Sequence, residues 1–135
     1  MTILSRSRSR AGFFAICGVL VGVVAGGVLL AQAQREFNVS ARKYAFTVSG
    51  TDAAEIRVNQ DDNVFISFTA EDIAHSFTID DDHYRISRRA EPGGKAAQFR
   101  FRADKPGEFA ITCSLQIDDK CRGMRAKLVV AAKTR

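Results

Sequence analysis

Tryptophan is absent from this sequence, proline and histidine each occur only twice, and cysteine occurs three times. The ten phenylalanines must therefore supply much of the volume of any hydrophobic core. The sequence contains no Ser/His/Asp arrangement, no carboxylate pair beside a cleft signal and no phosphate-binding loop. Gly93 and Gly94 follow Pro92, as is typical of a turn. These absences argue against catalysis by this chain alone.

A basic stripe is also lacking, although the formal net charge is +5. Three of the 20 basic residues, Arg6, Arg8 and Arg10, lie within the first ten positions. The remaining 17 basic residues are scattered among 15 acidic ones. Because nucleic-acid binding needs basic residues gathered on one face, this pattern indicates an ordinary solvated surface and no nucleic-acid partner.

No charged residue occurs between Arg10 and Arg35. A hydrocarbon core is crossed by about 20 apolar residues, and arginines flanking such a segment favour the cytoplasmic side. The predicted organisation is a basic cytoplasmic N-terminus (1–10), a single transmembrane anchor (11–34) and an extracytoplasmic domain (35–135). The domain then lies on the periplasmic side of the cell membrane.

The alternative to an anchor is a signal peptide cleaved after Ala33, because Ala31–Ala33 has the form of a cleavage site. Signal peptides usually have an apolar stretch of about 7–15 residues, so the longer run favours the anchor. Both interpretations export the domain. Within the run, glycines spaced four apart could pair two helices into a homodimer, although a glycine-rich run without a partner is the preferred reading. These glycines are Gly18, Gly22 and Gly26, and Cys17 precedes them.

After Arg35 the apolar residues alternate with polar ones in short segments separated by turn signals, which is typical of half-buried strands. About eight short strands in about 100 residues predict an all-β antiparallel sandwich or small barrel. No stretch after Arg35 has a convincing helical period. The predicted strands are Glu36–Ser40, Tyr44–Val48, Glu55–Val58, Asn63–Thr69, His75–Ile79, Gln98–Ala103, Glu108–Cys113 and Arg125–Val130.

Sulfur-containing residues gather in one stretch, CSLQIDDKCRGM, which runs from Cys113 to Met124. Exported thiols are commonly paired or bound to metal, so this stretch predicts a metal site, a disulfide or simply a turn. His75 begins another predicted strand, and in a sandwich that end can lie beside Cys113. An imidazole with thiolates and a thioether favours copper, or zinc where two thiolates and a nitrogen are offered.

From Tyr44 to Val130 the sequence resembles a cupredoxin, and in particular the copper A domain of cytochrome c oxidase subunit II. AEDIAHSFTI is similar to the segment with the first copper histidine of that family, RISRRAEPGGKAAQFRF to its middle hairpin, and DKPGEFAITCS to the strand with the first cysteine. The resemblance implies a Greek-key β-sandwich with copper at one end that relays electrons. Such a chain is at most an accessory subunit of an oxidase-type complex.

The ligand loop of that family reads Cys, three residues, Cys, three residues, His, two residues, Met. Here Cys113 and Met124 match its first and last ligands. Ile117 replaces the second cysteine and Cys121 replaces the histidine. Isoleucine cannot bridge two copper ions, so the expected cofactor is mononuclear copper. The implied metal ligands are His75, Cys113, Cys121 and Met124, with Leu115 offering a backbone carbonyl.

Two alternatives to this copper site stay open. The family geometry places both cysteine side chains around one metal, so a Cys113–Cys121 disulfide can form and leave a metal-free structural or assembly module. Otherwise the thiols alternate between metal and disulfide, as in copper delivery or thiol redox. By the resemblance, His83 lies in the wrong place and is expected to point into water.

The expected partners are the membrane, through the N-terminal helix, and a redox protein or oxidase subunits. Charged residues near the middle hairpin could dock an electron-transfer partner, but a solvated hairpin is the preferred reading. These residues are Asp80, Asp81, Asp82, Arg85, Arg88 and Arg89.

Overall fold

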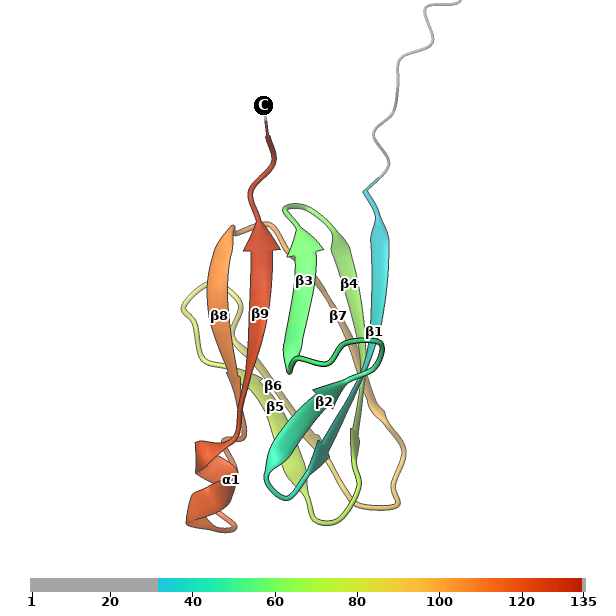
Figure 1. Cartoon of the computed structure of the whole chain (residues 1–135), viewed down its shortest axis with the longest axis vertical. Helices are drawn as coiled ribbons and strands as arrows, with labels where there is room; N and C mark the ends of the chain where they lie inside the picture. Colours follow the sequence, from blue (N-terminus) through green and yellow to red (C-terminus); the bar gives the residue numbers. More distant parts are fainter. Residues whose placement is uncertain (1–31, 135) are drawn as a thin grey trace, which may run out of the picture.

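The computed structural model describes residues 32–134. It contains nine strands and one short helix (Figure 1). They are β1 (Gln34–Arg42), β2 (Ala45–Val48), β3 (Glu55–Asn59), β4 (Asn63–Ala70), β5 (His75–Ile79), β6 (Ile86–Ala90), β7 (Ala97–Arg102), β8 (Gly107–Thr112), α1 (Asp119–Gly123) and β9 (Arg125–Ala131). The strands form a four-stranded sheet, β2-β1-β4-β7, and a five-stranded sheet, β3-β9-β8-β5-β6. The prediction of an all-β sandwich is thereby confirmed.

The expectation of purely antiparallel pairing is wrong for two pairs of strands. β1 pairs with β4 in parallel, and β3 pairs with β9 in parallel. Parallel neighbours need a long connection, and here the chain crosses between the sheets before each such pair is completed. A period of two reports which face a side chain occupies but not the direction of the neighbouring strand.

Two elements were not among those predicted from the residue pattern. In β6 the three consecutive residues Ser87–Arg89 are all exposed, between the buried Ile86 and Ala90, so no alternation marks this strand. The helix α1 has only five residues, which is too short to show a helical period, and it corrects the expectation that no helix follows Arg35.

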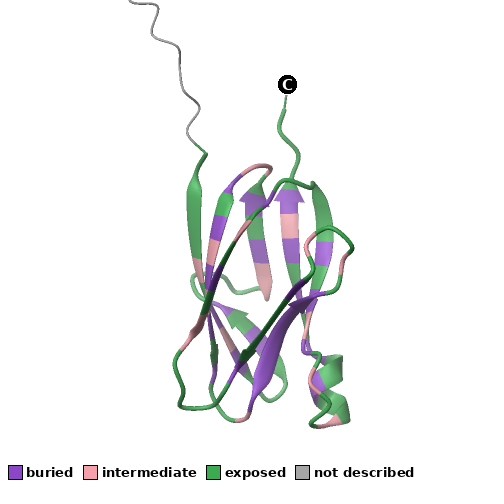
Figure 2. Cartoon of the chain, turned by 180° about the vertical axis from the view of Figure 1, so that it is seen from behind, coloured by how far each residue is buried: buried purple, intermediate pink, exposed green. Residues whose placement is uncertain are grey.

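The core lies between the two sheets, and the buried phenylalanines Phe46, Phe68, Phe77, Phe99 and Phe109 share it with valine, isoleucine and alanine side chains. Buried and exposed segments alternate along most strands in Figure 2. The ring of Phe77 on β5 packs edge-on against Phe68 of the opposite sheet, with 5.9 Å between ring centroids. It also packs against Phe99, at 5.2 Å. Phe77 shares its face of β5 with His75, so this packing also fixes the strand that carries His75.

The first described residues and the C-terminal end lie at one end of the sandwich, and α1 lies at the other (Figure 1). Within residues 32–134 no helix has the length and apolar character needed to cross a membrane. The predicted anchor, Cys17, the spaced glycines and the basic N-terminus fall within 1–31, outside the described residues.

At the end away from α1, Asp61 joins the turn before β4 to the segment that follows β9. Lys133 Nζ donates to Asp61 Oδ2 at 2.6 Å, and Arg102 Nη2 donates to Asp61 Oδ1 at 3.0 Å. These hydrogen bonds hold the pKa of Asp61 below its usual range, with Lys133 contributing most and partial burial acting in the opposite direction.

Acid should therefore weaken the fold partly through Asp61. A carboxyl group whose pKa is lowered on folding stabilises the fold above its unfolded pKa, near 4, and this contribution is lost as the pH falls further. In the Asp61→Asn variant we expect a smaller loss of stability between about pH 5 and pH 3 than in the native chain. Thermal unfolding across this range measures the difference, and an acid dependence equal to that of the native chain would contradict the prediction.

Candidate metal and thiol site

The fold brings three of the predicted site residues together at the α1 end of the sandwich. His75 begins β5, Cys113 directly follows β8, and Cys121 lies on α1. β5 and β8 are neighbours in one sheet, which places the first two side by side. One ligand atom from each residue lies within 4.8 Å of the other two. All three side chains are buried, with exposed fractions of 0% for His75, 2% for Cys113 and 0% for Cys121.

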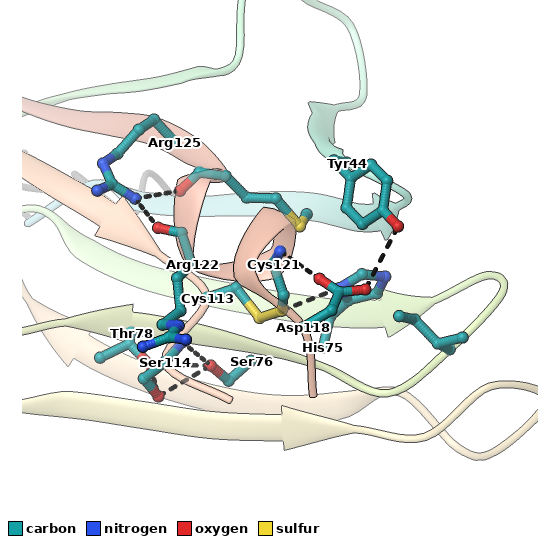
Figure 3. Close-up of a disulfide and its surroundings, with 12 residues drawn as sticks. Tyr44, His75, Ser76, Thr78, Cys113, Ser114, Asp118, Cys121, Arg122 and Arg125 are labelled. Atoms are coloured by element: carbon teal, nitrogen blue, oxygen red, sulfur yellow. Dashed lines mark hydrogen bonds between the residues drawn. A yellow bond between two sulfur atoms is a disulfide. The ribbon is translucent and has the colours of Figure 1, made fainter. Parts of the chain in front are cut away.

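The two cysteines are joined by a disulfide in this structure. Their Cα atoms are 5.7 Å apart, within the usual range for a disulfide, and eight positions separate them in the sequence. Cys121 Sγ also lies 3.8 Å from His75 Nδ1 (Figure 3). The structure thus contains the disulfide that was one of the open alternatives, with an imidazole nitrogen directed at one of its sulfurs.

The second ring nitrogen of His75 is held by a carboxylate. His75 Nε2 lies 2.9 Å from Asp72 Oδ1, so Nε2 donates and Asp72 accepts. The pKa of Asp72 is held far below its usual range. Burial acts in the opposite direction but is outweighed by hydrogen bonds from the backbone amides of Lys43 and Ile73 and from the His75 ring. Because Nε2 is used by Asp72, Nδ1 is the ring nitrogen that lies on the side of the sulfurs.

The helix α1 positions Cys121 through a cap at its first turn. Asp118 is the N-cap residue, and its carboxylate accepts a hydrogen bond of 2.7 Å from the Cys121 amide. An aspartate at this position satisfies an amide that the helix itself leaves unpaired. At the other end the Met124 amide donates to the carbonyl of Cys121 at 3.1 Å. Cys121 is therefore held at both its amide and its carbonyl.

A cluster of three hydroxyl groups joins β5, the strand that begins with His75, to Ser114, the residue that follows Cys113. Ser114 N donates to Ser76 Oγ at 2.7 Å. The hydroxyls of Ser76, Thr78 and Ser114 lie 2.9–3.1 Å from one another. Ser76 and Thr78 are both buried. This hydroxyl cluster holds His75 and Cys113 in register independently of the disulfide.

Removing the Ser76 hydroxyl should destabilise the domain by about 1–3 kcal/mol, because the Ser114 amide loses its hydrogen-bond acceptor and the Thr78 hydroxyl keeps only its contact with Ser114. The variant to test is Ser76→Ala, with urea unfolding as the measurement. Ser87→Ala, on the exposed part of β6, is the matched control and should change the stability by less than about 0.5 kcal/mol. Equal effects of the two substitutions would show that the hydroxyl cluster contributes nothing specific.

The remaining predicted site residues lie at different depths. Met124 is buried, at 1% exposed, at the C-terminal end of α1. Leu115 is partly buried and packs against the core. Ile117 is 50% exposed, so the residue at the family's second cysteine position does not point into the buried site. His83 is exposed, as expected, and its ring bonds to Asp104 at 2.7 Å.

The donor atoms fit a soft metal ion only when the cysteines are reduced. Thiolate sulfur is the form that binds metal, and a disulfide sulfur has lost that charge. The reduced pair with the Nδ1 atom of His75 would offer two soft sulfurs and a nitrogen, a set that suits copper or zinc. The residues present therefore fit copper in the dithiol form and do not fit it in the disulfide form.

Residue patterns alone did not identify the residues that position His75, Cys113 and Cys121. Asp72 precedes His75 by three positions and lies in the AEDIAHSFTI segment that carries the resemblance, but no residue pattern marked it as the partner of the imidazole. Asp118 precedes Cys121 by three positions, and an aspartate there is typical of a helix start, which is the one signal that could have revealed α1. Tyr44, in the turn between β1 and β2, hydrogen-bonds to Asp118, and no local sequence pattern indicates such a long-range contact.

No protein-family model and no curated protein matches this sequence. Solved structures do match its fold. A chain of a heme-copper terminal oxidase dimer is 24% identical, with a TM-score of 0.63, covering 76% of this chain and 67% of its own. The periplasmic domain of subunit II of cytochrome oxidase (CoxB) from Bradyrhizobium japonicum is 16% identical, with a TM-score of 0.63 and coverage of 76% and 87%.

A blue copper protein has the same architecture. Auracyanin A from Chloroflexus aurantiacus is 16% identical, with a TM-score of 0.57, covering 73% of this chain and 99% of its own. The sequence resemblance and the architecture therefore agree. The chain has the cupredoxin fold and resembles the copper A domain of cytochrome c oxidase subunit II.

Proposed function

We propose that this chain is a copper-binding cupredoxin module that acts in one-electron transfer or copper handling on the extracytoplasmic side of a membrane. The observation that carries the proposal is the buried group of one imidazole and two sulfurs, with ligand atoms within 4.8 Å of one another. The structural neighbours include a chain of a heme-copper oxidase, a subunit II domain of a cytochrome oxidase and a blue copper protein, which supports copper as the metal. The proposed ligands are His75, Cys113, Cys121 and Met124, with the Leu115 carbonyl as a further donor.

The redox state of the cysteine pair would decide whether this site can hold metal. The disulfide is then the metal-free state, and reduction supplies the two thiolates that bind a soft ion. We expect one copper per chain, because Ile117 offers no second bridging sulfur and its side chain is half exposed. The site would differ from a blue-copper centre in having a second thiolate where such a centre has a second imidazole.

Copper, when bound, supplies a one-electron couple between its two common oxidation states. Asp72 orients the His75 ring through Nε2 and leaves Nδ1 available. The hydroxyl cluster and the sheet keep His75 and Cys113 at a fixed separation. Burial excludes water from all three donors. Such a preorganised site needs little rearrangement when the charge at its centre changes.

The expected cellular setting follows the sequence and the neighbours. One structural neighbour is a periplasmic domain of an oxidase subunit, which supports an extracytoplasmic position for this domain. The apolar run of 11–34 would anchor it, or would act as a cleaved signal. The partner would be a redox protein or the other subunits of an oxidase-type complex, and the chain itself would not be catalytic.

A second candidate function is a metal-free structural or assembly module. The disulfide present in the structure favours it. Closing such a short loop would stabilise the fold by roughly 2–3 kcal/mol relative to the open dithiol. In this case the cupredoxin architecture would serve as a scaffold for protein contacts, and the thiols would have no role as ligands.

Titration of the reduced full-length chain with Cu(I), and separately with Cu(II), tests the proposal. Copper bound per chain and visible absorption are recorded without oxygen. One tightly bound copper supports the proposal: an intense thiolate-to-copper band indicates electron transfer, and colourless Cu(I) binding indicates copper handling. No copper bound by the reduced chain would overturn the proposal and leave the structural module. Two coppers per chain would contradict the mononuclear assignment.

A further inference from the structure

The helix that carries Cys121 is contacted by a side chain from the opposite sheet. Tyr44 lies in the turn between β1 and β2, and its hydroxyl donates to Asp118 Oδ2 at 3.3 Å (Figure 3). The same carboxylate uses its other oxygen, Oδ1, to cap the Cys121 amide. One aspartate therefore connects the tyrosine hydroxyl to the backbone of the cysteine.

A second contact reaches α1 through the face of the same ring. The Lys120 ammonium lies 5.2 Å from the centroid of the Tyr44 ring, within the range of a cation–π interaction. Lys120 immediately precedes Cys121 in the helix. Tyr44 is 38% exposed, so the ring lies at the surface and covers α1 from outside rather than filling the core.

We propose that Tyr44 is a positioning residue that holds Cys121 beside Cys113 and His75 when the disulfide is open. In the oxidised chain the covalent bond fixes Cys121 whether or not Tyr44 is present. After reduction, the segment from Ser114 to Gly123 is free of that cross-link. Ser114 is still held by its hydrogen bond to Ser76, whereas the position of α1 then depends on the two Tyr44 contacts and on the burial of Cys121 and Met124.

By holding Cys121 near Cys113, Tyr44 should raise the effective concentration of one thiol at the other. It should also lower the free-energy cost of bringing both thiols to one metal ion. The inference deepens the proposed function and rests on it for the role of the thiols as ligands. Its first test requires no metal. It is the equilibrium constant for disulfide formation in a glutathione redox buffer, measured on the full-length chain. A Cys17→Ser background leaves only Cys113 and Cys121 to titrate.

Tyr44→Ala should lower this equilibrium constant about tenfold, because one exposed hydrogen bond and one exposed cation–π contact are lost. Tyr44→Phe keeps the ring and loses only the hydroxyl, so a drop of about threefold is expected. Lys120→Ala should also lower the constant, and should add little when combined with Tyr44→Ala, because both remove the same contact.

Tyr84→Phe is the matched control, since Tyr84 is the other tyrosine of the chain. Its hydroxyl bonds to the backbone of Lys105, in the loop before β8. This variant should leave the equilibrium constant unchanged even if it lowers the melting temperature. Equal constants for the native chain, Tyr44→Phe and Lys120→Ala would overturn the inference, and so would an equal drop in the control.

The metal serves as a separate readout. If the proposed function holds, the Cu(I) affinity of the reduced chain should fall in Tyr44→Ala by about the same factor as the disulfide constant. If the native chain binds no copper, the proposed function fails while the disulfide measurement still decides the role of Tyr44. A lowered disulfide constant with unchanged Cu(I) affinity would refute the positioning of Cys121 as a metal ligand.

Discussion

The Cys113→Ser variant is expected to bind Cu(I) at least about a hundredfold more weakly than the reduced native chain. Loss of an outer partner of a metal ligand already costs about 10–100-fold in affinity, and here a ligand itself is removed. Cys113 is buried between β5 and α1, where a serine hydroxyl offers neither the charge nor the soft sulfur that copper requires. Competition with a coloured Cu(I) chelator measures the affinity.

The variant is compared with Cys17→Ser, which removes the cysteine that is not among the proposed ligands and should leave the affinity unchanged. Cys113→Ser also prevents the disulfide, so each protein is assayed fully reduced and without oxygen. Unchanged copper stoichiometry and affinity in Cys113→Ser would place the copper elsewhere and refute the proposed ligand set. Loss of copper with a retained fold, seen as an unchanged far-ultraviolet spectrum, would support it.

Replacing Phe77 with alanine should lower the free energy of unfolding by about 3–5 kcal/mol. Phe77 is fully buried, and its ring packs edge-on against rings from β4 and β7. Its removal leaves a cavity between the two sheets in addition to the lost burial of the ring. Because domains of this size are stable by only about 5–15 kcal/mol, the variant should be close to unfolding, which urea denaturation monitored by circular dichroism measures.

Phe65→Ala is the matched control for this prediction. Phe65 lies on β4 with a half-buried ring, over which the Arg100 guanidinium lies at 5.2 Å from the centroid. We expect a loss of no more than about 1–2 kcal/mol, since an exposed cation–π contact and part of the ring burial are removed. Similar losses of unfolding free energy in the two variants would contradict a central packing role for Phe77 between the sheets.

Most of the strands that could be predicted have one face in the core and one face in water, although all five residues of the predicted strand β5 are buried. In β4 the residues Val64, Ile66 and Phe68 are buried, and the residues between them are more exposed. Such alternation is written in the sequence because each strand needs an apolar face. In β6 three consecutive residues, Ser87–Arg89, are exposed, so this strand gave no alternating signal. Nor was the direction of strand pairing predictable, since parallel and antiparallel pairing both place alternate residues on the same faces.

The chemistry of the candidate site was also readable from residue types, but its state was not. His75, Cys113 and Cys121 are soft donors of the strand-rich domain, and both the predicted sandwich and the resemblance indicated that they lie together. Whether the sulfurs bind each other or a metal depends on their separation in space and on oxidation. The described structure has them joined, with the imidazole at 3.8 Å from Cys121 Sγ.

By itself the sequence determined a strand-rich domain with a phenylalanine core, and a short sulfur-bearing segment near its C-terminus. Only the tertiary structure decided which groups surround that segment. Asp118 meets the hydroxyl of Tyr44 across 74 positions of sequence, and Ser114 meets Ser76 across 38. The physical reason is that alternation and capping report local backbone preferences, whereas these contacts arise from the packing of two sheets and the loops at their end.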